Sequence, residues 1–434
     1  LRAAEGAGGV NSSGKVTNES AVGSIPSNWP ALRAKVLYKE RKELSETGEE
    51  ELLSASHLTG ITKRSEKDVG MFLAETLEGY KKVYPGDAVV NTMWAWMGAL
   101  GVSRELGVIS PSYGVYRPIG KLKDPRYYDF LFRSAPFVAE VNRRSKGVWS
   151  SRLRLYPDDF LTMHLPFPSF SEQKAIADFL DRETARIDQL IYKKKSFLSL
   201  MARRIDAIVD DAISDNTVPR IRFEHVVQRM QRPVDLSEHD ELVRLGLYNR
   251  GRGIFKKPAT DEEGMGDSSF YFVREGDLIL SGQFAWEGAV ALATEDEEGC
   301  VVSHRYPVYR GKDGINTAYL LGLLRSNYGD FLLNEASRGS AGRNRPLNTW
   351  RLGKEKVPIP SRELQEAVDR ALAFERQLKK NTEQSISLLN EARAALITAA
   401  VTGQIDVTTW GKQGQTDRRL DQIEEDMALR EARA

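Results

Sequence analysis

The sequence predicts a mixed α/β fold of the α+β kind, in which two copies of one globular domain are separated by two long helices. Three observations support this prediction: an internal repeat of about half the chain, short strand-like segments bounded by turn residues, and apolar residues at heptad spacing after each copy. A chain of 434 residues is too long for one ordinary core, and its 41% hydrophobic content allows each domain its own.

The repeat consists of residue matches that occur in the same order in both halves. Residues 85–99 match residues 275–289, with Gly-Asp, Ala-Trp and Gly-Ala pairs at the same spacing. Further matches are Ser110 with Ser303, Tyr113 with Tyr306, 115–117 with 308–310, 132–134 with 324–326, 145–147 with 337–339, 165–169 with 357–361, and Gln173 with Gln365. Matches over this much of the chain predict a tandem duplication and a pseudo-twofold arrangement.

Each copy begins with short alternating segments bounded by Gly, Pro, Asp and Ser, which are typical of β-strands and turns. We interpret Asp87 and Asp277 as turn residues rather than metal ligands or catalytic carboxylates, because neither has an acidic partner at ligand spacing. Trp96 and Trp286 could stack on bases, but we expect them to anchor the small β core of each copy.

A long helix is predicted after the first copy, with Ser171 as its N-cap and about 40 residues spanning roughly 60 Å. Its apolar seam is interrupted by one lysine. The seam positions are Leu180, Thr184, Ile187, Ile191, Lys194, Leu198, Met201, Ile205, Ile208 and Ala212.

A second helix follows the second copy and has a less regular seam. Its apolar positions are Val368, Leu372, Ile386, Leu389, Leu396 and Ala400. Glu375, Lys379 and Arg393 also fall at seam positions. We expect the two helices to form an antiparallel coiled-coil pair; the alternative is a plain helical connector.

These patterns divide the chain into six segments. They are a flexible N-terminal segment (1–24), a first domain (25–168), a first spacer helix (169–215), a second domain (216–360), a second spacer helix (361–407) and a charged C-terminal tail (408–434).

Two stretches resemble conserved regions of type I restriction–modification specificity subunits. The first resembles the central conserved region through 151–156, Leu165-Pro166-Phe167-Pro168, Glu172-Gln173, Ile176-Ala177, 179–181, 183–185 and 187–191. The second, 395–407, is similar to the distal conserved region, although Leu364 separates Glu363 from Gln365 where the family more often has Glu-Gln adjacent.

The resemblance implies two target recognition domains that read the halves of a split site in double-stranded DNA. It implies that the helices set the gap and dock two methyltransferase subunits, which restriction (translocase) subunits join for ATP-dependent cleavage. S-adenosylmethionine, ATP and Mg would then belong to those partners, and this chain would hold no cofactor.

Basic and amide side chains in Gly-, Ser- and Asn-rich loops are the best candidates for DNA contacts, because they suit phosphates and base edges. In the first copy they are Lys63, Arg64, Arg143, Arg144, Lys146 and Arg152. In the second copy they are Asn249, Arg250, Arg252, Lys256, Lys257, Arg338, Arg343, Asn344 and Arg345. An ordinary solvated loop is the alternative for each of them.

Composition excludes several other functions. A single cysteine, Cys300, rules out an internal disulfide and a zinc site built on cysteine pairs, and the five histidines are scattered. The sequence contains neither a methyltransferase cofactor and catalytic motif nor an ATPase phosphate loop, so we predict no catalysis and no metal. No stretch approaches the ~20 apolar residues of a membrane span, and we expect a cytoplasmic protein.

The net charge of +1 gives DNA binding no support by itself, although basic groups can gather on one face. Two alternatives therefore stay open: an enzyme with an unrecognised site, and a coiled-coil scaffold that assembles partners without reading DNA.

Overall fold

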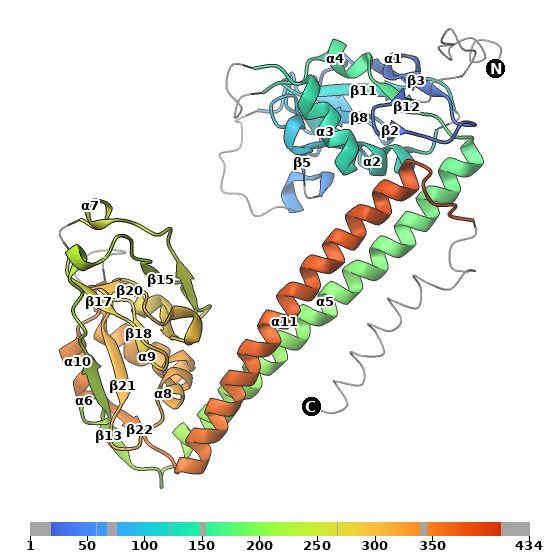
Figure 1. The fold of residues 1–434 in the computed structure, drawn as a ribbon. Coiled ribbons are helices and arrows are strands. Elements are labelled where there is room, and N and C mark those ends of the chain that lie inside the picture. Colours follow the sequence, from blue (N-terminus) through green and yellow to red (C-terminus); the bar gives the residue numbers. More distant parts are fainter. Residues whose placement is uncertain are drawn as a thin grey trace. The chain divides into compact units, whose positions relative to one another are not determined.

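The computed structural model describes residues 19–57, 59–66, 76–121, 123–147, 153–266, 268–338 and 345–408. The chain divides into two compact units, Leu1–Tyr192 with Ser385–Ala434, and Lys193–Gln384. Each unit combines a small β domain with parts of two long helices, which confirms the predicted mixed fold (Figure 1).

The first unit is built on a four-stranded antiparallel sheet of order β4-β11-β8-β9. Its strands are β4 (Tyr38–Glu40), β11 (Gly114–Pro118), β8 (Ala88–Val90) and β9 (Leu100–Val102). Every residue of β8 and β9 is buried, because both faces of these short apolar strands are covered. Smaller antiparallel pairs are β1 (Glu19–Ser20) with β2 (Gly23–Ser24), β3 (Ala31–Arg33) with β12 (His164–Pro166), β5 (Leu53–Ser56) with β6 (Gly60–Lys63), and β7 (Lys81–Val83) with β10 (Gly107–Ile109).

Short helices pack on this sheet and enclose an aromatic core. They are α1 (Ala34–Leu37), α2 (Pro125–Arg133), α3 (Ala135–Arg144), α4 (Pro157–Leu161) and the 3₁₀ turns η1 (Arg64–Glu66) and η2 (Ala95–Met97). Helix α2 begins at Pro125 because Asp124 caps it, accepting a hydrogen bond from the backbone N–H of Arg126 at 2.9 Å. The rings of Tyr128 and Phe132 from α2 pack against Tyr38.

The second unit repeats the four-stranded sheet of the first and the order of its main strands and helices, which confirms the duplication. Its sheet has the order β14-β21-β18-β19, with strands β14 (Val227–Met230), β21 (Val308–Gly311), β18 (Leu278–Leu280) and β19 (Val290–Leu292). The other strands are β13 (Arg220–Arg222), β22 (Lys356–Pro358), β15 (Leu245–Leu247), β16 (Ile254–Lys256), β17 (Phe270–Phe272) and β20 (Val301–Ser303). The helices are α6 (Phe223–Val226), α7 (Glu262–Met265), α8 (Thr317–Arg325), α9 (Asn327–Ala336), α10 (Thr349–Lys354) and the 3₁₀ turns η4 (Leu236–Glu238), η5 (Ala285–Glu287) and η6 (Glu295–Glu297).

The long helices are α5 (Phe170–Ser214) and α11 (Arg362–Val401), and each begins beside a serine cap. Ser169 is the cap of α5, so our assignment of Ser171 was wrong. The Ser169 hydroxyl accepts a hydrogen bond from the N–H of Glu172 at 3.3 Å, and the Glu172 carboxylate accepts one from the N–H of Ser169 at 2.9 Å. This reciprocal capping box follows the Ser-x-x-Glu pattern and starts the helix before Ser171.

The two helices run antiparallel, as predicted, and lie side by side in Figure 1. In the first unit Ala400 and Val401 of α11 share a core with Leu180 of α5, while Leu389 packs with Ile187 and Leu190. In the second unit Ile205 and Val209 of α5 share a core with Val368 and Leu372 of α11. Burial of these seam residues contradicts the alternative of a plain connector.

The three polar residues at seam positions of α11 each have a specific partner. Arg393 contacts the Asp188 carboxylate at 2.8 Å, and Glu375 contacts the Arg325 guanidinium at 2.8 Å. The Lys379 ammonium donates to the backbone carbonyl of Arg252 at 3.0 Å. The irregular seam therefore reflects contacts to the neighbouring helix and to the second β domain, which a heptad pattern does not register.

The segment before β3 and the segment after α11 pack together in the core of the first unit. Ala21 and Val22, in the hairpin of β1 and β2, are buried, so the folded part begins before Ile25 and the predicted flexible segment is too long. Gly403 follows α11 with φ of 70°, and a Cβ there would lie 2.4 Å from Cγ of Pro26. Only glycine suits this close approach. The predicted tail lies almost entirely outside the described residues.

Candidate nucleic-acid interface

Asp87 and Asp277 hold the turn that leads into the central strand of each sheet. The Asp87 carboxylate accepts hydrogen bonds from Arg41 at 2.7 and 3.1 Å and from the N–H of Tyr84 at 2.9 Å. Burial acts to lower the pKa of the Arg41 guanidinium, but the hydrogen bond and charge of Asp87 outweigh burial and raise that pKa. Sequence reasoning identified the turn and missed its arginine partner.

Asp277 is the equivalent residue of the second unit and has two arginine partners. It is 0% exposed, and it accepts from Arg232 at 2.6 and 3.1 Å, from Arg310 at 2.6 Å and from the N–H of Arg274 at 2.9 Å. A carboxylate with this many donors serves to hold the turn and two strands together.

The aromatic turns η2 and η5 correct our interpretation of the tryptophans. The buried residues of these turns are Ala95 and Ala285, whereas Trp96 and Trp286 are only partly buried. Each indole N–H donates to the carbonyl three residues earlier, at 3.0 Å for Trp96 and 3.1 Å for Trp286. The tryptophans are therefore not core anchors.

Two aromatic side chains that sequence reasoning missed occupy equivalent exposed positions. Trp94 is 53% exposed and Phe284 is 42% exposed, each at the start of its 3₁₀ turn. The match of Trp-Ala-Trp (94–96) with Phe-Ala-Trp (284–286) could have identified them. We considered only the second aromatic residue of each motif and not the first. Exposed aromatic residues at matching places in both units suit contacts with a bound partner.

The basic candidates of the first unit lie on the surface in ion pairs. Lys63 lies 3.7 Å from Glu105, Lys146 lies 2.8 Å from Asp159, and Arg143 and Arg144 share the Glu140 carboxylate. Hydrogen bonds from Arg143 are the main cause that holds the Glu140 pKa below its usual value. Exposed ion pairs contribute little to stability, so phosphates can compete for these cations.

The remaining candidates of the first unit are less informative. Arg64 is half-buried and starts η1, with its N–H donating to the carbonyl of Leu52 at 2.7 Å. Arg152 lies outside the described residues.

Three candidates of the second unit lie in the turn between β15 and β16, residues 248–253, which we call the recognition loop. The side-chain amide of Asn249 donates to the Glu287 carboxylate, so this amide is already engaged. The N–H groups of Arg250 and Gly251 donate to the carbonyls of Glu287 and Gly288, each at 2.7 Å. The side chains of Arg250 and Arg252 are exposed.

Other candidates of this unit are spread more widely. Arg345 lies over the Trp286 ring at 5.0 Å, close to the recognition loop. Lys256 donates to the carbonyl of Asp296, and Arg338 pairs with Glu335. The backbone N–H of Lys257 donates to the carbonyl of Arg244 at 2.8 Å, and the Lys257 side chain is exposed. Arg343 and Asn344 lie outside the described residues.

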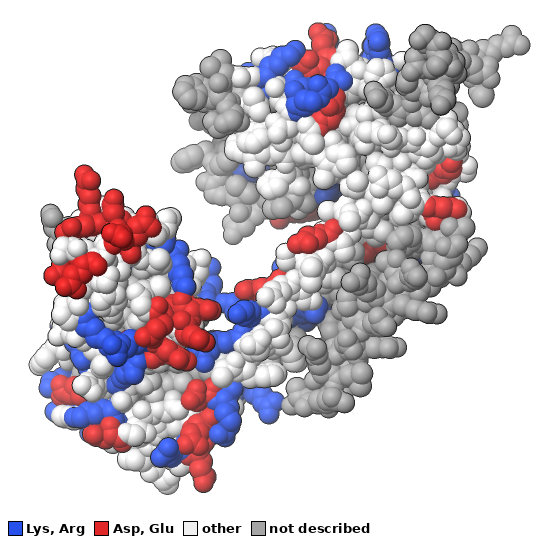
Figure 2. All heavy atoms as spheres, in the orientation of Figure 1, with Lys and Arg blue, Asp and Glu red and all other residues white. Residues whose placement is uncertain are grey.

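On the face shown in Figure 2, charge is mixed rather than gathered into one basic patch. Figure 2 shows acidic and basic side chains side by side on the second unit, with acidic ones concentrated around the end that carries α7. Asp261, Glu262 and Glu263 are exposed there. The cationic candidates are therefore local groups, in agreement with the net charge of +1.

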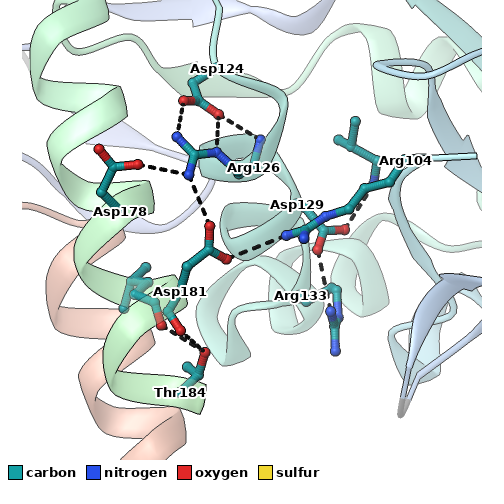
Figure 3. Close-up of polar contacts among 10 residues, drawn as sticks. Arg104, Asp124, Arg126, Asp129, Arg133, Asp178, Asp181 and Thr184 are labelled. Carbon is teal, nitrogen blue, oxygen red and sulfur yellow. Dashed lines mark hydrogen bonds and ion pairs between the residues drawn. The ribbon is translucent and has the colours of Figure 1, made fainter. Parts of the chain in front are cut away.

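A polar network joins the β domain of the first unit to α5 (Figure 3). The Arg126 guanidinium lies between Asp124 at 2.8 Å, Asp178 at 2.7 Å and Asp181 at 3.0 Å. Arg104 reaches Asp181 from the β domain at 3.4 Å. These contacts orient the domain on its spacer helix.

A buried glutamine makes the same connection in both units. Gln173 accepts from the N–H of Asp124 and donates to the carbonyl of Pro168, both at 2.9 Å. Gln365 accepts from the N–H of Asn316 and donates to the carbonyl of Pro360, also at 2.9 Å. Asp124 and Asn316 cap α2 and α8, so each glutamine links that cap to the start of a long helix.

Replacing Gln365 with leucine is expected to lower the free energy of unfolding by about 2–4 kcal/mol, because it leaves the partly buried N–H of Asn316 and the buried carbonyl of Pro360 without this partner. Urea unfolding followed by circular dichroism measures the change. The neighbour Glu366 has a partly exposed side chain that pairs with Arg362 on the helix surface. Its replacement by leucine is the control and should stay within about 0.5–1 kcal/mol of wild type. If Gln365→Leu were as stable as wild type, the glutamine would not stabilise the connection between α8 and α11.

The described residues show neither of two other kinds of site. Within those ranges, no three or more His, Cys, Asp and Glu side chains group in a way that could hold a metal ion. Among the described helices, none combines the length and apolar character needed to cross a bilayer.

Comparison with known proteins identifies relatives of this architecture. No family model matches the chain. The specificity subunit of the type I restriction enzyme StySPI from Salmonella potsdam is 19% identical over 355 residues, which cover 75% of this chain and 76% of that protein.

Two solved structures cover most of the chain. A chain from a structure on complex assembly and conformational transition of the type I restriction–modification system has a TM-score of 0.57 at 14% identity, covering 88% of this chain and 100% of its own length. The HsdS subunit of Thermoanaerobacter tengcongensis has a TM-score of 0.47 at 15% identity, covering 88% and 98%. The chain is thus similar in sequence to a type I restriction enzyme specificity subunit, and its duplicated domains and paired helices share the fold of a chain from a type I restriction–modification system.

Proposed function

We propose that this chain reads a bipartite, asymmetric target in double-stranded DNA, one half-site with each β domain. The observation that carries the proposal is the duplicated unit, which repeats the same sheet but carries a different turn between its equivalent strand pairs, β5–β6 and β15–β16. The turn after β5 presents His57, whereas the recognition loop presents Arg250 and Arg252. Because equivalent surfaces carry unlike side chains, the two half-sites should differ in sequence.

The chain itself is non-catalytic. The similarity to a subunit named for specificity, within a system described as a complex, supports this part of the proposal, in which the enzymatic activities lie in other chains. We propose that S-adenosylmethionine, ATP and Mg are bound by those partners and that the complex acts in the cytoplasm.

The paired helices are the proposed docking surface for two methyltransferase subunits, which restriction subunits then join. Large apolar side chains are exposed along them: Tyr192 and Leu200 on α5, and Phe374 and Leu388 on α11. Apolar side chains in such numbers on a helix surface favour burial against another protein. The helices would also act as a ruler that sets the gap between the half-sites.

Methylome sequencing of cells that carry this gene with its methyltransferase partner tests the proposal. The expected result is one modified motif with two unlike half-sites and a gap of fixed length. A scaffold that does not read DNA predicts a modification pattern that is the same with and without this chain, and that outcome would refute the proposal.

A further inference from the structure

We infer that the spacer helix α11 positions the recognition loop of the second unit, through Lys379 and the ion pair of Glu375 with Arg325. The inference rests on the proposed function, since it concerns which residues make the second half-site selective. It assigns a role in specificity to residues of the spacer helix that lie outside the β domain.

The recognition loop holds one residue with a side chain, Arg250, in the left-handed region of backbone conformation. Arg250 has φ of 59°, which is uncommon for a residue with a side chain, and Gly251 follows with φ of 60°. Hydrogen bonds to η5 hold the N–H groups of both residues. Arg252 lies over the Tyr248 ring at 5.2 Å, and its Nε donates to the carbonyl of Asn249 at 3.0 Å. The loop is thus folded so that two guanidinium groups face solvent.

Helix α11 contacts the loop directly through Lys379. Its ammonium donates to the carbonyl of Arg252 at 3.0 Å. A hydrogen bond from a charged donor is stronger than a neutral one, and this carbonyl belongs to one of the two exposed arginines. The Lys379 ammonium therefore ties the surface of α11 to the backbone of the loop at Arg252.

Helix α11 also contacts the side chain on which the loop packs, Arg325. Two hydrogen bonds, of 2.8 and 3.0 Å, join Arg325 to Glu375. Burial acts to lower the pKa of Arg325, but the hydrogen bond and charge of Glu375 raise it above its usual value. A Cβ on Gly251 would lie 3.1 Å from Nε of Arg325, so the loop rests closely on this ion pair.

The first unit lacks the lysine contact. With Gln173 and Gln365 aligned, Glu375 takes the place of Glu183 and Lys379 that of Ile187. Glu183 pairs with Arg182 at 2.8 Å, and Ile187 is buried against the partner helix. The lysine contact is therefore a feature of the second unit, and only the second half-site should depend on it.

The test uses the complex of the full chain with its methyltransferase partner and duplexes that carry the motif found by methylome sequencing. Single base pairs are changed in the first or the second half-site, and the initial rate of methylation is measured for each duplex. For Lys379→Met we expect discrimination at the second half-site to fall on the order of tenfold, with the first half-site unchanged.

Three further variants make the result specific. Lys379→Arg keeps a charged donor and should restore discrimination, whereas Gly251→Ala alters the loop directly and should reproduce the loss. Lys380→Met removes the adjacent exposed lysine of α11 and should behave as wild type.

The possible failures are distinct. Unchanged discrimination in Lys379→Met, or an equal loss in Lys380→Met or at both half-sites, would overturn the positioning role. Wild-type complex that methylates all altered duplexes alike would instead refute the proposed function.

Discussion

Replacing Asp277 with alanine is expected to destabilise the second unit by about 3–5 kcal/mol, enough to unfold its β domain under mild denaturing conditions. The substitution removes a fully buried carboxylate and leaves the guanidinium groups of Arg232 and Arg310 close together without their shared anion. It also leaves the N–H of Arg274 unpaired at the turn before β18. Each of these groups loses its main partner, although the Arg310 side chain, at 37% exposed, can still be solvated in part.

Urea unfolding combined with limited proteolysis measures the effect and shows which unit is lost. Cleavage should appear between residues 216 and 360 and spare the first unit. Asp87→Ala is the matched control, because Asp87 has a single arginine partner and its loss should cost less, about 2–3 kcal/mol. Equal effects of the two substitutions would contradict the role of the second arginine.

The architecture was predictable because the duplication leaves a long, ordered pattern in the sequence. The turn at Asp87 followed from Gly-Asp chemistry, and the long helices followed from heptad spacing. These features depend on residues that are close along the chain or that recur in it, so the sequence alone displays them.

The contacts that fix the domains were not predictable in this way. Arg41 lies 46 residues before Asp87, and Arg232 lies 45 residues before Asp277, so no local pattern connects them. Ala95 rather than Trp96 is buried, since the 3₁₀ turn directs the smaller side chain inward. Composition similarly singled out the loop arginines as candidates, but only the fold shows that Lys379 supports one of them.

The seam residues of α11 also show which contacts a heptad pattern cannot predict. A heptad pattern treats Lys379 as an irregularity, because it registers only the neighbouring helix. In the structure this residue faces the second β domain, where its partner is a backbone carbonyl that no side-chain pattern reveals.

Under the proposed function, the paired helices set the gap between the two half-sites, and shortening these helices tests that role most directly. Deletion of residues 194–197 from α5 and 381–384 from α11 removes about one turn, roughly 6 Å, from each helix. Both positions lie away from the capped helix starts, and circular dichroism checks that the variant remains folded.

The decisive measurement is the methylome of cells that carry this shortened variant with the methyltransferase partner. The account predicts the same two half-sites separated by a gap that is shorter by about two base pairs, at 3.4 Å per base pair. A folded, active variant that keeps the original gap, or that changes the half-sites instead, would contradict the account.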